Sequence, residues 1–366
     1  KLGVNQLTNV LLSTVRMSTP DDMYLEAFDN TKLVAMNTCP TWGILRYQMH
    51  KTFPNGGGRA LALEAGTAMH EVFAWVRLCQ LAYQTFNKYR SEERQAMWEV
   101  HGQRVLGNCL WEDIEQQYVP NLDDNFHDYV KRGALLVLEN GDFYDDPSDR
   151  RRTISNMQEC ALAYIDRWNF NTNNVWIRNA NNLTDDVGIE IPFDLCCNIQ
   201  LVDYALNFRL TGKIDGIHQQ GDRVILHENK TASRLNDAWL MSFYLNTQPT
   251  HYMIAASCFT NSRIDTAKIL GITIPLPKQH NMGGIVEEVV TRKNYHFIRW
   301  MQWLVHTIEL YNKYKNNPID APKYTHSCNR YFSACSFIPF CDNEDDDQRE
   351  ILSEMITEEW SPLNNG

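Results

Sequence analysis

Apolar residues recur at helical spacing along much of the first half of the chain and again near its end. The stretches 71–89 and 92–106 show this spacing, and residues 59–185 contain few strand signals. Residues 288–315 repeat the pattern and run into Asn316-Asn317-Pro318, a sequence that stops a helix. Residues 1–38 are expected to form helix and loop. The pattern therefore predicts a mostly helical first half and a long amphipathic helix near the end.

Strand character is concentrated in the middle of the chain. Short β-rich runs cover 187–193, 208–217 and 223–228, and Gln219-Gln220-Gly221-Asp222 is a turn that joins the last two as a hairpin. A helix is expected over 237–260 and another strand over 267–274. The order of helices, small sheet and helices predicts an α/β (α+β) fold with a helical insertion. The predicted segments are 1–58, 59–185, 186–318 and 319–366, the last a Cys-rich loop followed by an acidic tail.

Composition and charge change this picture in two ways. The 366 residues are 43% hydrophobic, enough for a sizeable core, yet no apolar run approaches the 18 residues of a membrane span. With no signal-peptide pattern at Lys1, a cytoplasmic location is expected, in the host cytoplasm for a viral protein. The net charge is −11, but residues 342–359 carry −8 of it. The remainder is close to neutral and is compatible with a local basic channel for nucleic acid.

The segment with the clearest chemistry is the predicted hairpin. Glu228 and Lys230 alternate onto one face of a strand, and Asp215 lies on the neighbouring strand within reach of Glu228. Two carboxylates at this separation can hold Mg²⁺ or Mn²⁺, and Lys230 can stabilise a phosphoryl transition state. The alternative is a surface Glu–Lys pair of little energetic value, which the triplet alone would favour.

Two flanking segments bear on this choice. Upstream, Gly66 begins a small-residue stretch that would let a helix approach another chain closely and direct His70 inward. Downstream, Gln248 and Tyr252 occupy positions i and i+4 and share one helical face. Taken singly, a histidine on a helix is more often a core residue than a ligand, and the Gln–Tyr pair is weak evidence.

Together these segments resemble the RecB-type branch of the PD-(D/E)XK nuclease superfamily. That branch has a Gly-x-x-x-His helix, an Ile-Asp-Gly strand, a Glu-x-Lys strand and a Gln-x-x-x-Tyr helix, and this chain has all four in order. The resemblance covers residues 39–341 and implies a restriction-endonuclease-like core, with a small mixed sheet flanked by helices. It also implies the site roles: metal binding by His70, Asp215, Glu228 and the Asn229 carbonyl, catalysis by Lys230, and positioning by Gln248 and Tyr252.

Two further parts of the resemblance concern Glu190 and the substrate. Glu190 matches a strand glutamate of some family members and is a candidate for a further metal ligand or for a base behind the ligands, with an exposed strand residue as the alternative. The implied activity is a DNA exonuclease or end-processing enzyme acting on single strands or ends in recombination, repair or replication. Because no Gly-x-x-x-x-Gly-Lys-Ser/Thr motif is present, a helicase or recombination protein would be a separate partner.

Three cysteines stand close together near the C-terminus. Cys328, Cys335 and Cys341 indicate metal binding rather than disulfides in a cytosolic chain, and Cys39 is the candidate fourth ligand. Iron–sulfur members of the same branch, AddB-like and CRISPR-associated, have one cysteine before the core and three after it. The resemblance thus implies a [4Fe–4S] cluster, with Zn²⁺ as the alternative because six residues separate the first two C-terminal cysteines.

Candidate DNA contacts directly follow the Glu-x-Lys strand. Thr231, Ser233 and Arg234 place hydroxyls and a guanidinium beside the expected scissile phosphate, and Arg151 in an arginine triplet is a further phosphate contact or else a solvated side chain. The competing function is a non-catalytic DNA-binding or assembly module that keeps the fold, which the intact catalytic set disfavours. A metalloenzyme for small phosphorylated substrates would need a nucleotide-cradling glycine-rich loop, and Gly56-Gly57-Gly58 is interpreted as a turn.

Overall fold

The computed structural model describes residues 15–53, 61–107, 111, 125–170, 174–276, 284–330 and 333–358. The chain divides into two compact units, each assembled from segments that are distant in sequence. The first unit comprises Lys1–Arg59, Pro192–Lys213 and Lys293–Gly366, and the second comprises Ala60–Ile191 and Ile214–Arg292. The four consecutive segments expected from the sequence stay a prediction, and the Gly56–Gly58 turn lies outside the described residues.

The N-terminal segment of the second unit contains the helices α4 (Leu61–Thr85), α5 (Ser91–Leu106), α7 (Phe126–Asn140) and α8 (Ile154–Arg167). The long helix α4 packs against the other three. The ring of Trp75 on α4 is fully buried and packs against Trp98 of α5, with 5.6 Å between ring centroids. This aromatic core confirms the mostly helical character predicted for 59–185.

The second unit also holds a mixed sheet. Strand β7 (Arg223–Ala232) pairs antiparallel with β6 (Ala205–Gln220) and parallel with β8 (Thr266–Thr273). Strand β9 (Ile285–Thr291) continues the sheet antiparallel to β8, and the short β4 (Asn174–Val175) pairs with β6. The predicted hairpin between β6 and β7 is confirmed, with Gly221 at a φ of +60° in its turn.

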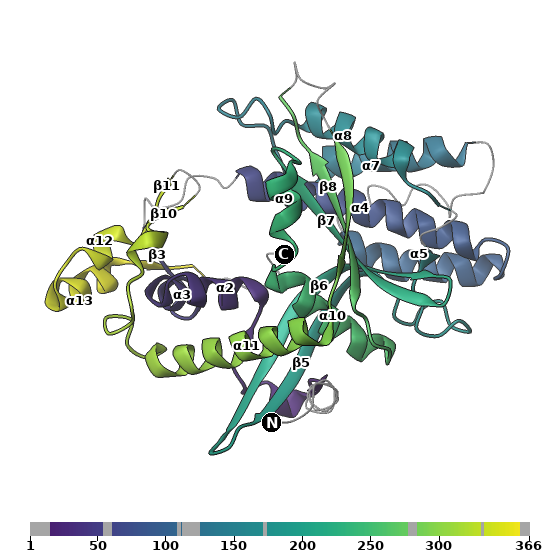
Figure 1. Ribbon diagram of the computed structural model, residues 1–366. Helices are drawn as coiled ribbons and strands as arrows, with labels where there is room; N and C mark the ends of the chain where they lie inside the picture. Colours follow the sequence, from purple (N-terminus) through teal and green to yellow (C-terminus); the bar gives the residue numbers. More distant parts are fainter. Residues whose placement is uncertain are drawn as a thin grey trace. The chain divides into compact units, whose positions relative to one another are not determined.

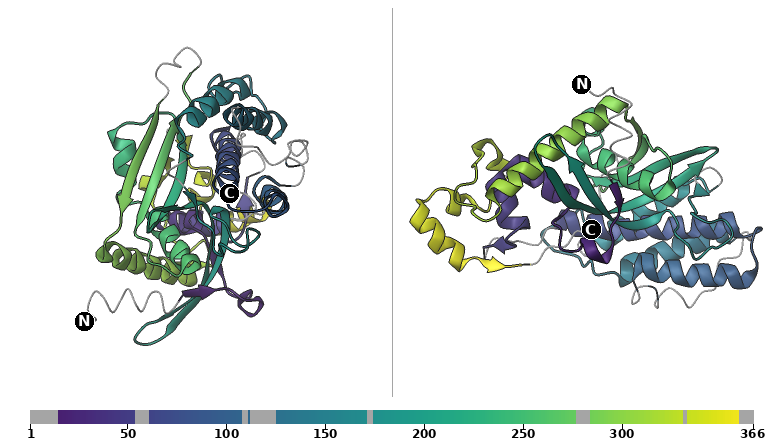
Figure 2. Two further views of the ribbon diagram at one scale, coloured as in Figure 1. Left: turned by 90° about the vertical axis from the view of Figure 1, so that its right-hand side faces the viewer. Right: turned by 90° about the horizontal axis from the view of Figure 1, so that it is seen from below.

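Helices cover both faces of this sheet, as the fold class predicted. Helices α4 and α8 contact β7 and β8 from one side, and α10 (Thr247–Thr260) contacts the same strands. Figure 1 shows α4, α7 and α8 on one side of β7 and β8, with α9 (Asp237–Ser242) and α10 on the other. The left view of Figure 2 keeps this arrangement. Gly271 of β8 lacks a side chain where the ring of Trp239 from α9 closes on the strand.

Two of the predicted helices differ in the structure. The helix expected over 237–260 is two helices, because Asn246 leaves the helical conformation and its side chain caps α10 by accepting from the Gln248 N–H. The helix expected over 288–315 begins only at Asn294, as α11 (Asn294–Tyr314). Residues 288–291 belong to β9 instead, whose β-branched residues pair with β8.

The first unit is a smaller assembly of helices and short strands. Helix α11 packs against α2 (Asn30–Thr38) and α3 (Pro40–Tyr47), and Figure 1 shows α11 running along this pair. Strand β5 (Ile189–Gln200) pairs with β1 (Val15–Met17), and β6 pairs with β2 (Ala27–Phe28). Both β5 and β6 contribute residues to both units.

The C-terminal part of the first unit contains more structure than the loop and tail that were expected. Its elements are η3 (Thr325–Ser327), β10 (Asn329–Arg330), β11 (Ser333–Ala334), α12 (Ile338–Cys341), α13 (Asp345–Glu354) and β12 (Ile356–Thr357). Strand β12 pairs with β3 (Lys51–Thr52), and a 3-10 helix, η1 (Pro20–Asp22), follows β1. None of the helices in the described ranges is long and apolar enough to cross a membrane.

Candidate active site

The candidate site lies in the second unit, where strands β6 and β7 stop pairing. The last pair of the ladder is Gly216 with His227, so the next residues, Asp215 and Glu228, face each other just beyond it. The Asn229 N–H, which has no strand partner there, donates to Oδ2 of Asp215 at 2.7 Å. This hydrogen bond fixes the Asp215 carboxylate at the end of the ladder, and Asp215 and Glu228 are 5% and 1% exposed.

Helix α4 and strand β5 bring a histidine and a second glutamate to Asp215. Nδ1 of His70 lies 3.5 Å from Oδ2 of Asp215. The ligand atoms of His70, Glu190 and Asp215 all lie within 4.8 Å of one another, the one such group of three in the described parts of the chain. An imidazole and two buried carboxylates are a donor set that suits Mg²⁺ or Mn²⁺. These residues therefore fit a divalent metal.

Glu190 has an unusual backbone for a strand residue. Its φ is +45°, in the left-handed region that residues other than glycine, asparagine and aspartate rarely adopt. Its carbonyl accepts from Nη1 of Arg104 at 2.9 Å, and its side chain is 6% exposed. The alternative of an exposed strand residue is thus wrong. A strained backbone held in a buried, polar setting is a feature that concentrates at functional sites.

Glu228 stands slightly apart from that group of three. Its Oε1 lies 2.5 Å from Nζ of Lys230, and its Oε2 is buried with no hydrogen-bond partner among the described residues. Burial, and then the nearby charge of Asp215, raise the pKa of Glu228 to about 8. A buried carboxylate oxygen without a partner is costly unless a cation or a proton satisfies it. The ion pair of Glu228 and Lys230 is not the exposed surface pair that was the alternative.

The neighbouring charges give the two carboxyl groups of the site, Asp215 and Glu228, different pKa values. Burial acts to raise the pKa of Asp215, but the charges of His70, Lys230 and Arg77, with the Asn229 N–H, bring it below its ordinary value. Burial acts to lower the pKa of Lys230, and the charges of Glu228 and Asp215 more than reverse that effect. The site therefore holds an ionised aspartate and an ammonium beside a carboxyl group that titrates near neutrality.

Arg77 is a site residue that the sequence reasoning missed. It is fully buried on α4, two turns after His70. Its Nη1 donates to the Asp215 carbonyl at 2.8 Å and lies 3.7 Å from Oε1 of Glu190, while Nη2 lies 3.3 Å from Nδ1 of His227. The signal was an arginine inside an otherwise apolar helical run, Trp75-Val-Arg-Leu-Cys79, because a buried guanidinium requires partners.

The other predicted residues lie around this centre. Nε2 of Gln248 and Oη of Tyr252 form a 3.2 Å hydrogen bond on α10, the helix that packs on β7 and β8. Ser233 and Arg234 follow β7 and are exposed. Thr231 precedes them on the strand, and its Oγ1 would lie 3.4 Å from a Cβ at Gly66, an ordinary contact rather than a forced close approach.

Two predicted features lie away from these residues in the chain. Arg151 is in the turn before α8, where its N–H donates to Oδ1 of Asp149. The four predicted cluster cysteines, Cys39, Cys328, Cys335 and Cys341, all belong to the first unit and form no disulfide. Each of the thiols Cys335 and Cys341 has its pKa raised by burial first and then by the charges of the neighbouring thiols, including Cys39 and Cys328. The four thiols are therefore near enough for their charges to affect one another.

The chain matches a known protein family over most of its length. The family model of the PD-(D/E)XK nuclease superfamily matches residues 30–342. No curated protein matches the chain. Among solved structures, the one titled "Crystal structure of SSO0001" is 14% identical over 63% of this chain and 92% of its own, and its TM-score of 0.26 is too low to support any argument.

Proposed function

Because the chain belongs to the PD-(D/E)XK nuclease superfamily, whose members are metal-dependent nucleases, we propose that it is a DNA exonuclease or end-processing enzyme of the RecB-type branch. Single strands or DNA ends are the proposed substrates, in recombination, repair or replication. The observation that carries the proposal is the buried group of His70, Glu190 and Asp215 beside the Glu228–Lys230 pair. A helicase or recombination protein would be a separate partner inside the cell.

The donor atoms of the site support an assignment of the metal ligands. His70, Glu190 and Asp215 would hold Mg²⁺ or Mn²⁺, and Glu228 would join them when it ionises, together with the Asn229 carbonyl. When bound, the metal supplies Lewis-acid polarisation of the scissile phosphate and activation of water. Oε2 of Glu228 supports this assignment because it is buried without a hydrogen-bond partner among the described residues, and a bound cation would satisfy it.

Lys230 is the proposed catalytic residue. Its ammonium lies at the end of β7, held at 2.5 Å by Glu228, and its side chain is 27% exposed while that of Glu228 is 2% exposed. The ammonium is thus the member of the pair that a phosphate arriving from solvent can reach. It would stabilise the negative charge that grows on the phosphate in the transition state and orient the attacking water.

Neighbouring side chains would place the substrate. Gln248 and Tyr252 are bonded to each other on α10 and would position Lys230 or the DNA backbone. Ser233 and Arg234 are exposed directly after β7, where they and Thr231 would contact phosphates. Arg151 is proposed as an additional phosphate contact.

A [4Fe–4S] cluster in the first unit completes the proposal. Cys39 caps the junction of α2 and α3, and the other three cysteines lie between η3 and the end of α12. Zn²⁺ is the alternative metal for the same four thiolates.

A cleavage assay tests the function. Wild-type protein with Mg²⁺ or Mn²⁺ should degrade linear single-stranded and duplex DNA and leave closed circles intact. Lys230→Ala should lower the rate by about 10² to 10³, the effect of removing one transition-state donor, without lowering the melting temperature by more than a few degrees. Equal activity of the two proteins would remove the catalytic assignment, and cleavage of circles at the same rate would remove the exonuclease assignment.

A further inference from the structure

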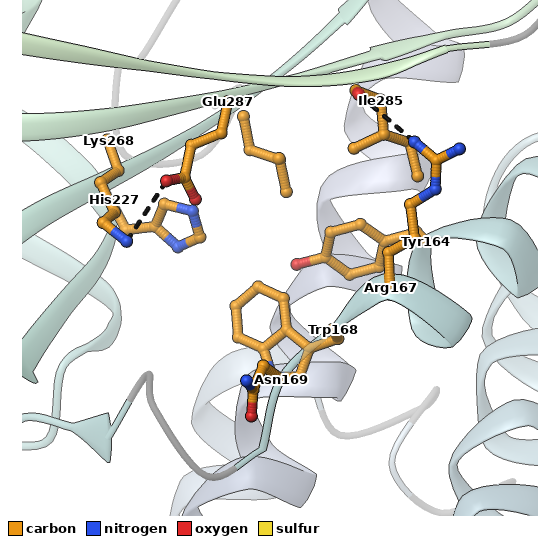
Figure 3. A pocket seen from close by; sticks show the side chains of 9 residues that line it. Tyr164, Arg167, Trp168, Asn169, His227, Lys268, Ile285 and Glu287 are labelled. Atoms are coloured by element: carbon orange, nitrogen blue, oxygen red, sulfur yellow. Dashed lines mark hydrogen bonds and ion pairs between the residues drawn. The ribbon is translucent and has the colours of Figure 1, made fainter.

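A cavity of about 210 Å³ lies in the second unit, between helix α8 and the sheet strands β7–β9. Figure 3 shows its lining, with the ring of Trp168 on one side and Lys268 and Glu287 of the sheet on the other. Leu270 and Ile285 supply apolar wall. Of the lining residues, His227 also contacts Arg77, whose side chain bonds the Asp215 carbonyl. None of the proposed metal ligands lines the cavity.

A tyrosine hydroxyl points into this space without a partner. Tyr164 is 1% exposed, and its Oη forms no hydrogen bond with any described residue. Figure 3 shows this hydroxyl directed toward the space in front of His227. A buried hydroxyl that lacks a partner costs stability, so its retention at a cavity wall indicates a ligand that accepts a hydrogen bond or supplies one.

His227 presents a second donor. Its Nδ1 lies 3.3 Å from Nη2 of Arg77, and because a guanidinium only donates, Nδ1 must be the acceptor and the ring proton must be on Nε2. The Nε2–H of this ring is then available to the cavity that it lines.

The charges at the rim favour an anion. Lys268 and Arg167 carry two positive charges at the cavity, and Glu287 carries one negative charge. Nζ of Lys268 lies 3.3 Å from Oε1 of Glu287, and the lysine side chain is 18% exposed while the glutamate side chain is 44% exposed. A glutamate so exposed can turn to solvent and leave the ammonium to a bound anion. The donors of Tyr164 and His227 then complete an anion site.

We propose that this cavity binds a nucleoside monophosphate. The phosphate would accept from Tyr164 Oη, His227 Nε2 and Lys268 Nζ, and the sugar and base would lie against Trp168, Leu270 and Ile285. Arg167 and Asn169, both exposed at the edge of the cavity, leave an open side through which the rest of the ligand reaches solvent. The choice of a nucleotide as the ligand rests on the proposed function, because an exonuclease releases nucleotides. The inference that the cavity binds an anion rests on its hydrogen-bond donors alone.

Calorimetry in EDTA tests the site, with 5′-dAMP, deoxyadenosine and inorganic phosphate as separate probes. Without a divalent metal, the nuclease centre has no cation to hold a phosphate, so binding of 5′-dAMP should come from the cavity. Tyr164→Phe and Lys268→Met should each weaken this binding about tenfold or more, as expected for the loss of a hydrogen bond to a charged group. Lys88→Met, which changes an exposed lysine away from the cavity, and Asp215→Asn should leave the affinity unchanged.

Each other outcome would overturn the proposal. Absence of 5′-dAMP binding would remove the site. Binding abolished by Asp215→Asn but not by Tyr164→Phe would place it at the nuclease centre. Phosphate or deoxyadenosine binding as tightly as 5′-dAMP would remove the nucleotide assignment. Because binding is read without catalysis, an inactive protein that still binds 5′-dAMP would contradict only the proposed nuclease function.

Discussion

The residues of the candidate site differ in how far the sequence could predict them. Asp215, Glu228 and Lys230 share a face of one hairpin, and their proximity follows from strand alternation and from the turn at Gly221. His70 comes from a helix more than 140 residues earlier, and only the resemblance to a family placed it beside Asp215. The sequence did not predict Arg77, because its role depends on partners from three different strands and no local sequence pattern shows those contacts.

Arg77 is expected to position the site rather than to take part in the reaction. Arg77→Met should lower kcat about 10-fold or more and weaken Mn²⁺ binding, because the Asp215 backbone and the Glu190 carboxylate lose a shared partner. Arg77→Lys should recover part of the metal affinity, since it restores the charge but not the fork of donors. Mn²⁺ titration followed by electron paramagnetic resonance measures this. Full metal affinity in Arg77→Met would contradict the positioning role.

Glu228 predicts a pH dependence for metal binding. Its pKa of about 8 in the metal-free protein means that a proton must leave before the carboxylate can bind a cation. Metal affinity should therefore rise with pH up to about 8 and level off above it. The free energy of unfolding of the metal-free protein changes with pH in the opposite direction. A carboxyl group with a raised pKa in the folded state favours folding at low pH, and this contribution is lost as the pH rises toward 8.

Titration calorimetry with Mg²⁺ in two buffers of different ionisation enthalpy measures the released proton. At pH 7 the wild-type protein should release close to one proton per metal, and Glu228→Gln should release less and show a flatter pH profile. Equal proton release by the two proteins would show that Glu228 is already ionised in the metal-free state.

At the scale of elements, hydrophobic periodicity predicted the type of an element correctly where one of its faces is buried. It failed where pairing with a neighbouring strand determines the conformation. Helix α4 was predictable because its apolar residues recur at helical spacing. The N-terminal part of the predicted helix over 288–315 was wrong because Glu288, Val289 and Val290 lie in a strand whose conformation comes from pairing with β8. The break between α9 and α10 depended on a single cap at Asn246.

Packing of α7 on α4 should be sensitive to a single methyl group. A Cβ at Gly133 would lie 2.1 Å from Cζ2 of Trp75, whose ring is fully buried and whose Nε1 donates to the Val130 carbonyl at 2.8 Å. Gly133→Ala should therefore destabilise the protein by about 1–3 kcal/mol, the usual cost of overpacking a core. Thermal unfolding followed by circular dichroism measures the loss.

Gly66→Ala is the matched control for this prediction. Both glycines lie in helices, but a Cβ at Gly66 meets only Thr231 Oγ1, at 3.4 Å. Alanine favours a helix over glycine by about 1 kcal/mol, so this variant should be at least as stable as the wild type. If Gly133→Ala were as stable as Gly66→Ala, the close packing of α7 on Trp75 would be contradicted.

At the scale of the whole molecule, the sequence was read as consecutive segments, whereas the structure interleaves them. The first unit takes its residues from both ends of the chain and from the middle. The periodicity of a segment does not predict which distant segment it will lie beside. The cysteine pattern does, because Cys39 needs partners near residue 330 to form a four-thiol site. All four cysteines belong to the same unit.

The last prediction concerns this four-thiol site, which would link segments nearly 300 residues apart. A cluster bound to Cys39 and to the three C-terminal cysteines restricts the unfolded chain as a long covalent loop does, a constraint worth about 5 to 6 kcal/mol for a disulfide closing a loop of this order. Protein prepared without oxygen should contain four irons and absorb near about 400 nm.

Cys335→Ser should lose the iron and unfold at a clearly lower temperature, because Cys335 packs beside the small core of Leu45, Phe337 and Phe340. Cys258→Ser, which changes a cysteine of α10 in the second unit, should keep both the iron and the melting temperature. One zinc per chain in place of iron would identify the alternative metal, and a metal-free wild type as stable as Cys335→Ser would show that the thiols hold nothing.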